Sequence, residues 1–400
     1  MKNKILSIFV LLVMIISSTS YAYTSLTIWN DNDTSETNST PLKNYLSIES
    51  ESAILIEMQT GQVLFEKDSH KQLRPASVTK IMSILLIMEA LDRGEITLET
   101  QVSCSENSSS MGGSQIWLDT TETLSVHDML KAISVVSAND CTVAMAEHLC
   151  GSEELFVQKM NERAKELGMN DTTFKNCHGI DEDGHFTSSY DISIMSRELL
   201  LNHPEITEYT TIWMDTLRDG KSELVNTNKL IRTYEGATGL KTGSTSLALY
   251  NLSASATRNN LSLISVVLKA PTPTIRFSEA KLLLDYGFNN YCSKTLANAG
   301  DIFQSINVEK GVVQEANVVY ETSPSFILEK NKESLITSEV TLNDTVSAPI
   351  TKGQQLGYIK YFCEENELKT INLIAESSIE KISFLSLSKH ILSKWFTLLK

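Results

Sequence analysis

Residues 75–80 read Pro-Ala-Ser-Val-Thr-Lys, and a helical pattern of apolar residues follows them directly. The pattern has the spacing of one helix face and consists of Ile81, Ile84, Leu85, Met88 and Leu91. Because positions i and i+3 share a helix face, the Ser77 hydroxyl and the Lys80 amine can meet at the start of this helix. A serine needs an adjacent base to become a nucleophile, and a lysine serves when its pKa is lowered. The stretch therefore predicts a helix that opens with a nucleophile beside its base.

Strand and helix patterns occur in blocks on either side of this helix. Before it, residues 52–56 and 62–65 read as a hairpin around Thr60-Gly61. After it come helical patterns at 126–136, 141–149, 153–167 and 190–201, strands at 240–244, 250–257 and 261–269, and a helix near 274–286. This order predicts an α/β (α+β) fold in which helices pack on an antiparallel sheet and a helical lobe is inserted in the middle.

The first 50 residues read as targeting and linking sequence. Lys2 and Lys4 precede an apolar run over residues 5–16, and small and polar residues follow it up to Ala22. This is the layout of a secretory signal peptide over residues 1–22, and it predicts an extracytoplasmic protein. Residues 23–50 are polar and read as a tether.

The rest of the chain divides into three expected regions, since 400 residues exceed one ordinary domain. Residues 51–290 hold the mixed pattern described above. Residues 291–376 show short alternating strands and turn signals, and we expect a small all-β domain there. Residues 377–400 form the last region.

The end of the chain is amphipathic. On a helical wheel one half is apolar and holds Phe384, Leu385, Leu387, Ile391, Leu392, Trp395, Phe396, Leu398 and Leu399. The other half is polar and holds Lys389, His390, Ser393, Lys394, Thr397 and Lys400. This pattern predicts a helix that lies on a membrane surface, and a helix docked on its own protein is the alternative.

Composition excludes two broad classes of protein. Apolar residues make up 42% and charged residues 21% of the chain, which is normal for a globular protein and excludes wholesale disorder. The net charge of −15 argues against a nucleic-acid partner, because phosphate binding needs basic patches. An even number of cysteines in an exported protein permits disulfides, but we expect buried free thiols. The six are Cys104, Cys141, Cys150, Cys177, Cys292 and Cys363.

Two further short motifs carry possible chemistry. Ser137-Ala138-Asn139 offers a hydroxyl that can relay a proton and an amide that can bind a peptide carbonyl, although such residues often only cap a helix. Lys241-Thr242-Gly243 lies in a strand pattern. Its lysine can hold a carboxylate and can also lower the pKa of Lys80 as a neighbouring cation, and its glycine leaves room for a substrate backbone. The alternative for this lysine is a solvated position before a turn.

The three motifs in this order are the signature of class A β-lactamases and penicillin-binding proteins, with Ala138 where the signature has Asp. Longer stretches extend the likeness to the low-molecular-weight penicillin-binding proteins, the serine-type D-alanyl-D-alanine carboxypeptidases. They are residues 75–80, 111–115, 137–140, 178–181 with Gly184-His185, and 239–245. The sequence resembles this family over residues 50–290, and the β-rich region and the amphipathic end match the family's architecture.

The resemblance implies roles for the four residues of the first two motifs. Ser77 attacks the carbonyl between two D-alanines and forms an acyl-enzyme. Lys80 takes the proton of Ser77. Ser137 passes a proton to the departing D-alanine, and Asn139 orients the substrate.

The resemblance assigns substrate binding to the strand over residues 241–245. Lys241 and either Thr242 or Thr245 hold the terminal carboxylate. The backbone N–H groups of Ser77 and Ser244 form the oxyanion hole, and Gly243 removes a side chain where the substrate backbone approaches the strand.

The resemblance also implies the partners of the protein. Its substrates are peptidoglycan stem peptides, and β-lactam antibiotics acylate it. No cofactor and no metal are expected. The amphipathic end holds the exported enzyme on the outer face of the cytoplasmic membrane.

Three other interpretations use different residues. His178, Asp181, Asp183 and His185 could bind a metal, but Gly179 and Gly184 mark this segment as a loop. Glu166 resembles the deacylating glutamate of β-lactamases, but the apolar face of its helix lies elsewhere and predicts a solvated charge. A non-catalytic wall-binding protein is the third alternative, and the intact motifs argue against it.

Overall fold

The computed structural model describes residues 46–383. The predicted signal peptide over residues 1–22, nearly all of the tether and the amphipathic residues 384–400 lie outside this range. Among residues 46–383, no helix combines the length and the apolar character that a membrane crossing requires.

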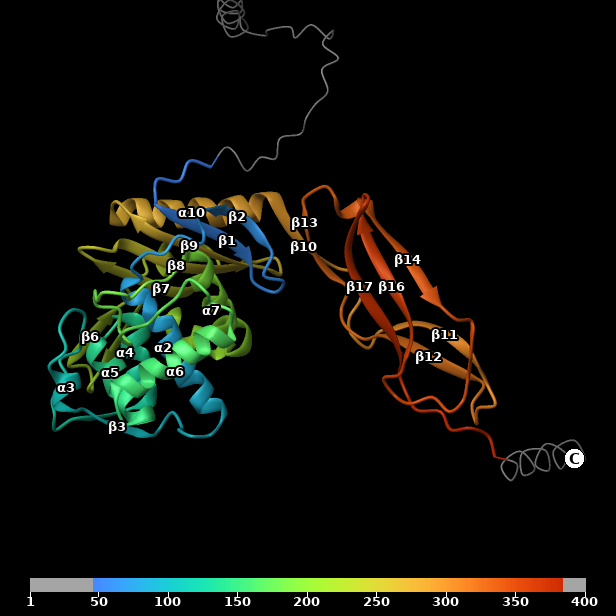
Figure 1. Ribbon diagram of the computed structural model, residues 1–400, viewed down its shortest axis with the longest axis horizontal. Coiled ribbons are helices and arrows are strands. Elements are labelled where there is room, and N and C mark those ends of the chain that lie inside the picture. The colour runs from blue at the N-terminus through green and yellow to red at the C-terminus, as the bar shows by residue number, and fades with distance from the viewer. Residues whose placement is uncertain (1–45, 384–400) are drawn as a thin grey trace, which may run out of the picture. The chain divides into compact units, whose positions relative to one another are not determined.

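A five-stranded antiparallel sheet forms the centre of the mixed α/β part of the chain, with the strand order β2-β1-β9-β8-β7 (Figure 1). The hairpin of β1 (Ser52–Glu57) and β2 (Val63–Lys67) pairs through β1 with β9 (Leu261–Ala270). The neighbouring strands are β8 (Leu249–Arg258) and β7 (Ala237–Thr245), so β7 forms an edge of the sheet. The hairpin and all three later strands are where the sequence predicts them.

Helices cover both faces of this sheet. On one face, α10 (Pro273–Asn290) buries Leu283 and Leu284 against sheet residues such as Leu55. On the other face, α2 (Lys80–Asp92) and α7 (Ser189–Asn202) share a core with residues such as Ile264 (Figure 1). Because both faces are covered, β1, β8 and β9 are buried along nearly their whole length, although β8 contains buried polar residues such as Asn251 and Ser253.

The segment between α2 and α7 forms the inserted helical lobe. Side-chain oxygens of Ser125, Ser152 and Ser188 accept N–H groups at the starts of α4, α6 and α7, and these caps explain where the helices begin. The elements of this lobe are β3 (Gln101–Ser103), α3 (Glu106–Ser109), β4 (Thr123–Ser125), α4 (Val126–Val135), α5 (Asn139–Cys150) and α6 (Glu153–Glu166).

Short elements connect α7 to β7. They are η3 (Pro204–Ile206), α8 (Thr207–Thr210), the hairpin of β5 (Met214–Leu217) and β6 (Ser222–Val225), and α9 (Leu230–Thr233). The 3-10 turn η2 (Ala76–Thr79) directly precedes α2.

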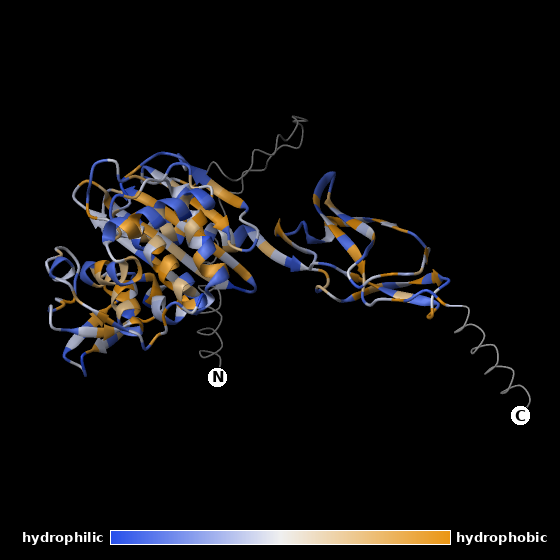
Figure 2. Ribbon diagram, turned by 60° about the horizontal axis from the view of Figure 1, so that its bottom comes forward, coloured by the Kyte–Doolittle hydropathy of each residue, from blue (hydrophilic) through white to orange (hydrophobic). Residues whose placement is uncertain are grey.

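The last described region is all β, apart from the one-turn element η4 (Glu333–Leu335). Six strands pair in the order β14-β16-β17-β12-β11-β15, and β10 pairs with β13. Along β11, β16 and β17, hydrophobic and hydrophilic residues tend to alternate (Figure 2), and their buried side chains contribute to a separate core. The strands are β10 (Tyr291–Thr295), β11 (Ile302–Glu309), β12 (Glu315–Tyr320), β13 (Ser325–Glu329), β14 (Ile336–Leu342), β15 (Thr345–Ser347), β16 (Gln355–Cys363) and β17 (Asn366–Ala375).

The structure confirms the predicted fold class, with a mixed α/β part followed by an all-β region. It extends the contacts of that region beyond the predicted end at residue 376. Ile379 is buried in the core of the β region and bridges to Ile350, and the Ile382 N–H donates to the Lys310 carbonyl at 2.7 Å. Local sequence patterns do not reveal these pairings, because the paired residues lie far apart in the chain.

All six cysteines lie within the described residues and are free thiols. Burial raises the pKa of Cys104, Cys141, Cys150, Cys177 and Cys292. The expectation of free thiols is therefore met, although Cys150 and Cys292 are only half-buried.

Candidate active site

The turn before α2 presents Ser77. Ala76 has a positive φ of 49°, a conformation that non-glycine residues adopt only when their surroundings impose it. The Asn251 amide from β8 donates to the carbonyls of Arg74 and Pro75, both at 2.9 Å, and holds this turn against the sheet. Ser77 remains half-buried, while the neighbouring side chains of η2 are buried. The hydroxyl of Ser77 is therefore fixed and still accessible.

The Lys80 amine contacts Ser77 from the first turn of α2. Its Nζ lies 3.1 Å from the Ser77 Oγ, 2.6 Å from the Asn139 Oδ1 and 2.6 Å from the His178 carbonyl oxygen. The last two oxygens can only accept hydrogen bonds. A neutral amine has two N–H groups for them, and its lone pair is then left for the Ser77 O–H. The predicted contact between Ser77 and Lys80 is present with the geometry of a nucleophile and its base.

Burial lowers the pKa of Lys80 to about 7, because its ammonium is completely removed from water. Burial also lowers the pKa of Lys241, and the nearby charges of Lys80 and Arg276 lower it further. The sequence interpretation requires a lowered pKa for Lys80, caused by burial or by a neighbouring cation, and it assigns Lys241 as that cation. Burial is the largest cause of the lowered pKa of Lys80. The repulsion between the two lysines instead lowers the pKa of Lys241.

Ser137 and Asn139 lie just before and at the start of α5, and the Asn139 side chain contacts the Lys80 amine. Ser137 has a positive φ of 65°, and its buried Oγ makes no hydrogen bond to any described residue. Asn139 is the first residue of α5, and its Nδ2 donates to the Gly112 carbonyl at 2.7 Å. Because an unpaired buried hydroxyl is costly, Ser137 is the group here that has most to gain from a ligand.

Asp140 supports this arrangement and is a residue that the motif analysis missed as a site residue. Its fully buried carboxylate accepts the N–H groups of Ile116 and Leu118 at 3.0 and 3.1 Å. In this way it holds the loop whose Ser114 carbonyl receives the Asn139 N–H at 2.7 Å. A charged residue next to a helix start suggests a cap, so its sequence position gave no distinct signal.

The Lys-Thr-Gly motif lies on β7, at the edge of the sheet. Lys241 is buried, and its Nζ donates to the Thr242 carbonyl at 3.0 Å. Thr242 is buried too and donates its hydroxyl to Thr227 at 2.7 Å. Ser244 is exposed, and the Thr245 hydroxyl accepts the Ala248 N–H at 2.9 Å.

Gly243 brings β7 against the nucleophile. A Cβ at this position would lie 2.9 Å from the backbone nitrogens of both Ser77 and Val78. The sequence interpretation assigned the missing side chain to the approach of a substrate backbone. In the structure it first allows the strand to approach η2.

Arg276 is the second residue that sequence reasoning missed. Its buried guanidinium donates from Nη1 to the carbonyls of Gly243 and Asn251, each at 3.3 Å, and burial lowers its pKa to about 10. It lies on the buried face of α10 together with Ala280 and Leu284. The sequence feature that could have identified Arg276 is its position, as a charged residue, on the largely apolar face of this helix.

The segment with His178 and His185 supports the nucleophile instead of forming the metal site of the rival interpretation. The His178 carbonyl receives Lys80, and the His185 ring lies 2.9 Å from the Thr79 hydroxyl. Burial lowers the pKa of His178 to about 3 and that of His185 to about 4, so both rings are neutral near pH 7. Asp183 points to solvent and pairs with Arg74 at 3.1 Å.

Glu166 is a solvated helix charge, as predicted. Its side chain is 66% exposed at the end of α6 and pairs with Arg163 at 3.2 Å. The structure thus separates Glu166 from the buried groups around Lys80.

Comparisons with known proteins agree with this geometry. Residues 35–272 match the family described as D-alanyl-D-alanine carboxypeptidase, and residues 291–381 match the C-terminal domain of penicillin-binding protein 5. The D-alanyl-D-alanine carboxypeptidase DacF of Bacillus subtilis is 43% identical over 355 residues, which are 88% of this chain and 91% of that protein.

Solved structures give the same result. Penicillin-binding protein 5 of Haemophilus influenzae aligns with a TM-score of 0.74 and 30% identity, over 84% of this chain and 99% of that chain. Penicillin-binding protein D2 of Listeria monocytogenes in its ampicillin-bound form aligns with a TM-score of 0.56 and 32% identity, over 61% of this chain and 99% of that chain.

Replacement of Gly179 should disrupt the support of the nucleophile. Gly179 has a φ of 93°, and a Cβ there would lie 1.9 Å from the Ala76 carbonyl oxygen, a backbone atom that cannot rotate away. Gly184 is a matched control, because its φ is 84° but its Cβ would meet only the flexible Lys175 side chain at 3.0 Å. We expect Gly184→Ala to lower the free energy of unfolding by about 1–2 kcal/mol, and Gly179→Ala by more than about 4 kcal/mol. Urea unfolding measures both, and equal losses would contradict the assigned clash.

Proposed function

The chain belongs to the D-alanyl-D-alanine carboxypeptidase family, and we propose that Ser77 is the nucleophile with which it releases the terminal D-alanine of peptidoglycan stem peptides. As a member of this family it is a serine-type carboxypeptidase and a penicillin-binding protein. One observation carries the assignment of the nucleophile. The amine of the fully buried Lys80 has two obligate acceptors and, as its third partner, the Ser77 hydroxyl.

In the proposed reaction, neutral Lys80 removes the proton of Ser77 while the Ser77 Oγ attacks the carbonyl carbon between the two D-alanines. The C–N bond then breaks, and the amine of the departing D-alanine takes up that proton through the Ser137 hydroxyl. The unpaired Oγ of Ser137 supports this role, because a relay needs a hydroxyl that is not already engaged. Water then hydrolyses the acyl-Ser77 ester, and Ser77 regains its proton.

The strand β7 provides the proposed binding site for the substrate. Backbone N–H groups of Ser77 and Ser244 stabilise the oxyanion, and loss of one such donor typically costs about 10²–10³ in rate. Lys241 holds the terminal carboxylate. Of its two candidate partners, Thr242 and Thr245, we favour Thr245. Every second residue of a strand lies on the same face, so Thr245 shares the face of Lys241 and Thr242 does not. The Thr242 hydroxyl also already donates to Thr227. Asn139, whose side chain contacts the Lys80 amine, orients the peptide.

β-Lactams are proposed to acylate the same serine. A penicillin presents a reactive acyl carbon and a carboxylate, and these groups correspond to the two ends of the scissile D-Ala-D-Ala unit. The ampicillin-bound relative from Listeria monocytogenes supports this assignment.

We further propose that the enzyme works outside the cytoplasm on a membrane surface. The signal-peptide layout of residues 1–22 and the amphipathic pattern of residues 384–400 support this location. Residues 51–290 are the proposed catalytic domain. The proposed β domain starts at residue 291, and the pairings of Ile379 and Ile382 support an end near residue 383.

Ser77→Ala should abolish labelling by a fluorescent penicillin and the release of D-alanine from an N-acylated peptide that ends in D-Ala-D-Ala. The change deletes only the nucleophilic oxygen, so the thermal unfolding midpoint should stay close to that of the wild type. Ser278→Ala, an exposed serine on α10, is the control and should label normally. A covalent adduct on the Ser77→Ala chain, mapped by mass spectrometry, would show that another residue is the nucleophile.

Acylation should depend on pH through Lys80, whose pKa is about 7. The protonated amine cannot accept a proton, so the second-order rate of acylation by penicillin should be low below this pH and rise through it. Lys241→Gln should weaken the binding of carboxylate-bearing substrates but leave the midpoint in place, because burial sets the pKa of Lys80. A flat profile would exclude Lys80 as the base, and an upward-shifted midpoint in Lys241→Gln would restore repulsion as the cause.

Removal of residues 384–400 should abolish binding to vesicles that contain anionic lipid and leave the release of D-alanine from a soluble peptide unchanged. Truncation after Ser383 keeps the pairings of Ile379 and Ile382 with the β region intact. A full-length chain with Lys389, Lys394 and Lys400 replaced by Gln is the matched control for charge, and it should bind more weakly. Equal co-sedimentation of the truncated and full-length chains would contradict the proposed anchor.

A further inference from the structure

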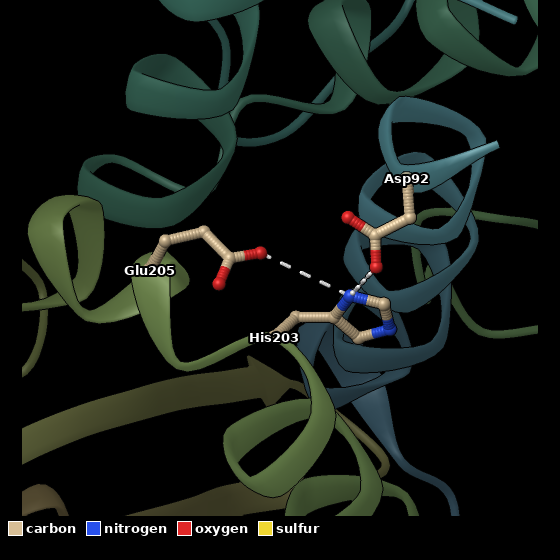
Figure 3. A group of neighbouring side chains, drawn as sticks. All are labelled: Asp92, His203 and Glu205. Atoms are coloured by element: carbon tan, nitrogen blue, oxygen red, sulfur yellow. Dashed lines mark ion pairs between the residues drawn. The ribbon is translucent and has the colours of Figure 1, made fainter. Parts of the chain in front are cut away.

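A cluster of three potential metal ligands lies at the far end of the catalytic helix α2 (Figure 3). Asp92 is the last residue of α2, His203 follows the end of α7, and Glu205 belongs to the short turn η3. Their ligand atoms all lie within 4.8 Å of one another. Helix α2 thus begins with the proposed base Lys80, directly after the turn η2 that holds Ser77, and it ends at this cluster.

The imidazole of His203 has an unused nitrogen that faces the two carboxylates. His203 is only 5% exposed, and its Nδ1 makes no hydrogen bond to any described residue. The Asp92 Oδ2 lies 2.9 Å from this nitrogen and the Glu205 Oε1 lies 3.9 Å from it, but neither has hydrogen-bond geometry. In a hydrogen bond the acceptor lies on the N–H axis. In a metal site the metal occupies that axis, and the other ligands lie to its side.

The ligand spacing fits a small divalent ion. Ligands about 2.1 Å from a tetrahedral zinc ion lie roughly 3.4 Å apart. The two distances from the His203 Nδ1, 2.9 and 3.9 Å, bracket this value, and small rotations of the exposed carboxylate side chains can equalise them.

The surroundings favour a cation. Asp92 and Asn202 end two helices, and the C-terminus of a helix carries a partial negative charge. The carboxylates of Asp92 and Glu205 add to it. The neighbouring Arg93 is already engaged, because its guanidinium pairs with Glu95 at 2.8 Å and with Glu89 at 3.8 Å.

We propose that Asp92, His203 and Glu205 bind one divalent transition-metal ion of the zinc type. An imidazole nitrogen with two carboxylates suits zinc or its first-row neighbours, whereas calcium and magnesium prefer ligands that are all oxygen. The exposed carboxylates, at 58% and 46%, leave coordination positions open to water.

The role of this ion is structural. Asp92 follows Lys80 by twelve residues, which is about 18 Å along a helix axis, so the ion does not take part in the chemistry at Ser77. By joining residues from α2, from the end of α7 and from η3, it fixes the end of α2 against the turn that follows α7.

Metal binding to the untagged, chelator-stripped chain tests the proposal. Titration calorimetry with zinc chloride should show one site, and cobalt should give the absorption bands of a site with a nitrogen ligand. Asp92→Asn and Glu205→Gln keep the shape of exposed side chains and should each weaken zinc binding by at least about tenfold. His70→Gln is the matched control, because His70 also lies 2.8 Å from an aspartate but lacks a third ligand. Zinc should raise the thermal midpoint of the wild type and of His70→Gln only.

Three outcomes would overturn the proposal. Zinc binding that is unchanged in both Asp92→Asn and Glu205→Gln would place the metal elsewhere. Absence of zinc and cobalt binding at millimolar concentration would leave the cluster as a plain ion pair. Preferential binding of calcium or magnesium would assign the wrong class of cation. His203→Gln is not needed for the decision, so a folding defect in that buried variant does not affect it.

Discussion

Removal of the Lys80 amine from water is the constraint on which the catalytic part depends. A buried ammonium is costly unless it is paired and hydrogen-bonded. The fold surrounds this amine with oxygens from three separate segments, namely η2, the start of α5 and the loop that contains His178. Such neutral oxygens make burial tolerable without fully favouring the charged form. The amine is consequently buried, hydrogen-bonded and basic enough to accept a proton near neutral pH.

The surrounding elements serve to hold these three segments together. Asn251 fixes the turn before Ser77, Asp140 fixes the loop beside Asn139, and Gly179 lets the His178 segment approach the Ala76 carbonyl. Gly243 brings the edge strand β7 against the same turn. The sheet and the helical lobe thus meet around one amine.

Much of this arrangement follows from the sequence, because local patterns determine local structure. The apolar spacing after Ser77 predicts α2, the Thr60-Gly61 turn predicts the first hairpin, and the Ser-x-x-Lys spacing predicts the contact between Ser77 and Lys80. The supports at Asn251, Asp140 and Arg276 were missed, because each contacts a partner that the chain order does not reveal. Whether burial or a neighbouring cation dominates the lowered pKa of Lys80 could not be decided from the sequence, since the depth of burial depends on how every segment packs. The cluster of Asp92, His203 and Glu205 could not be predicted either, because it forms only where the ends of α2 and α7 come together in the fold.

The six free thiols have a consequence for how this chain withstands its surroundings. The thiolate, and not the thiol, is the species that exchanges with disulfides and reacts with oxidants, and burial suppresses it in the five cysteines whose pKa is raised. The described part of the chain has no cross-link to lose in a reducing medium, and these five thiols react slowly in an oxidising one. Reduction of a disulfide therefore cannot destabilise the described part of the chain when the redox potential of its compartment changes.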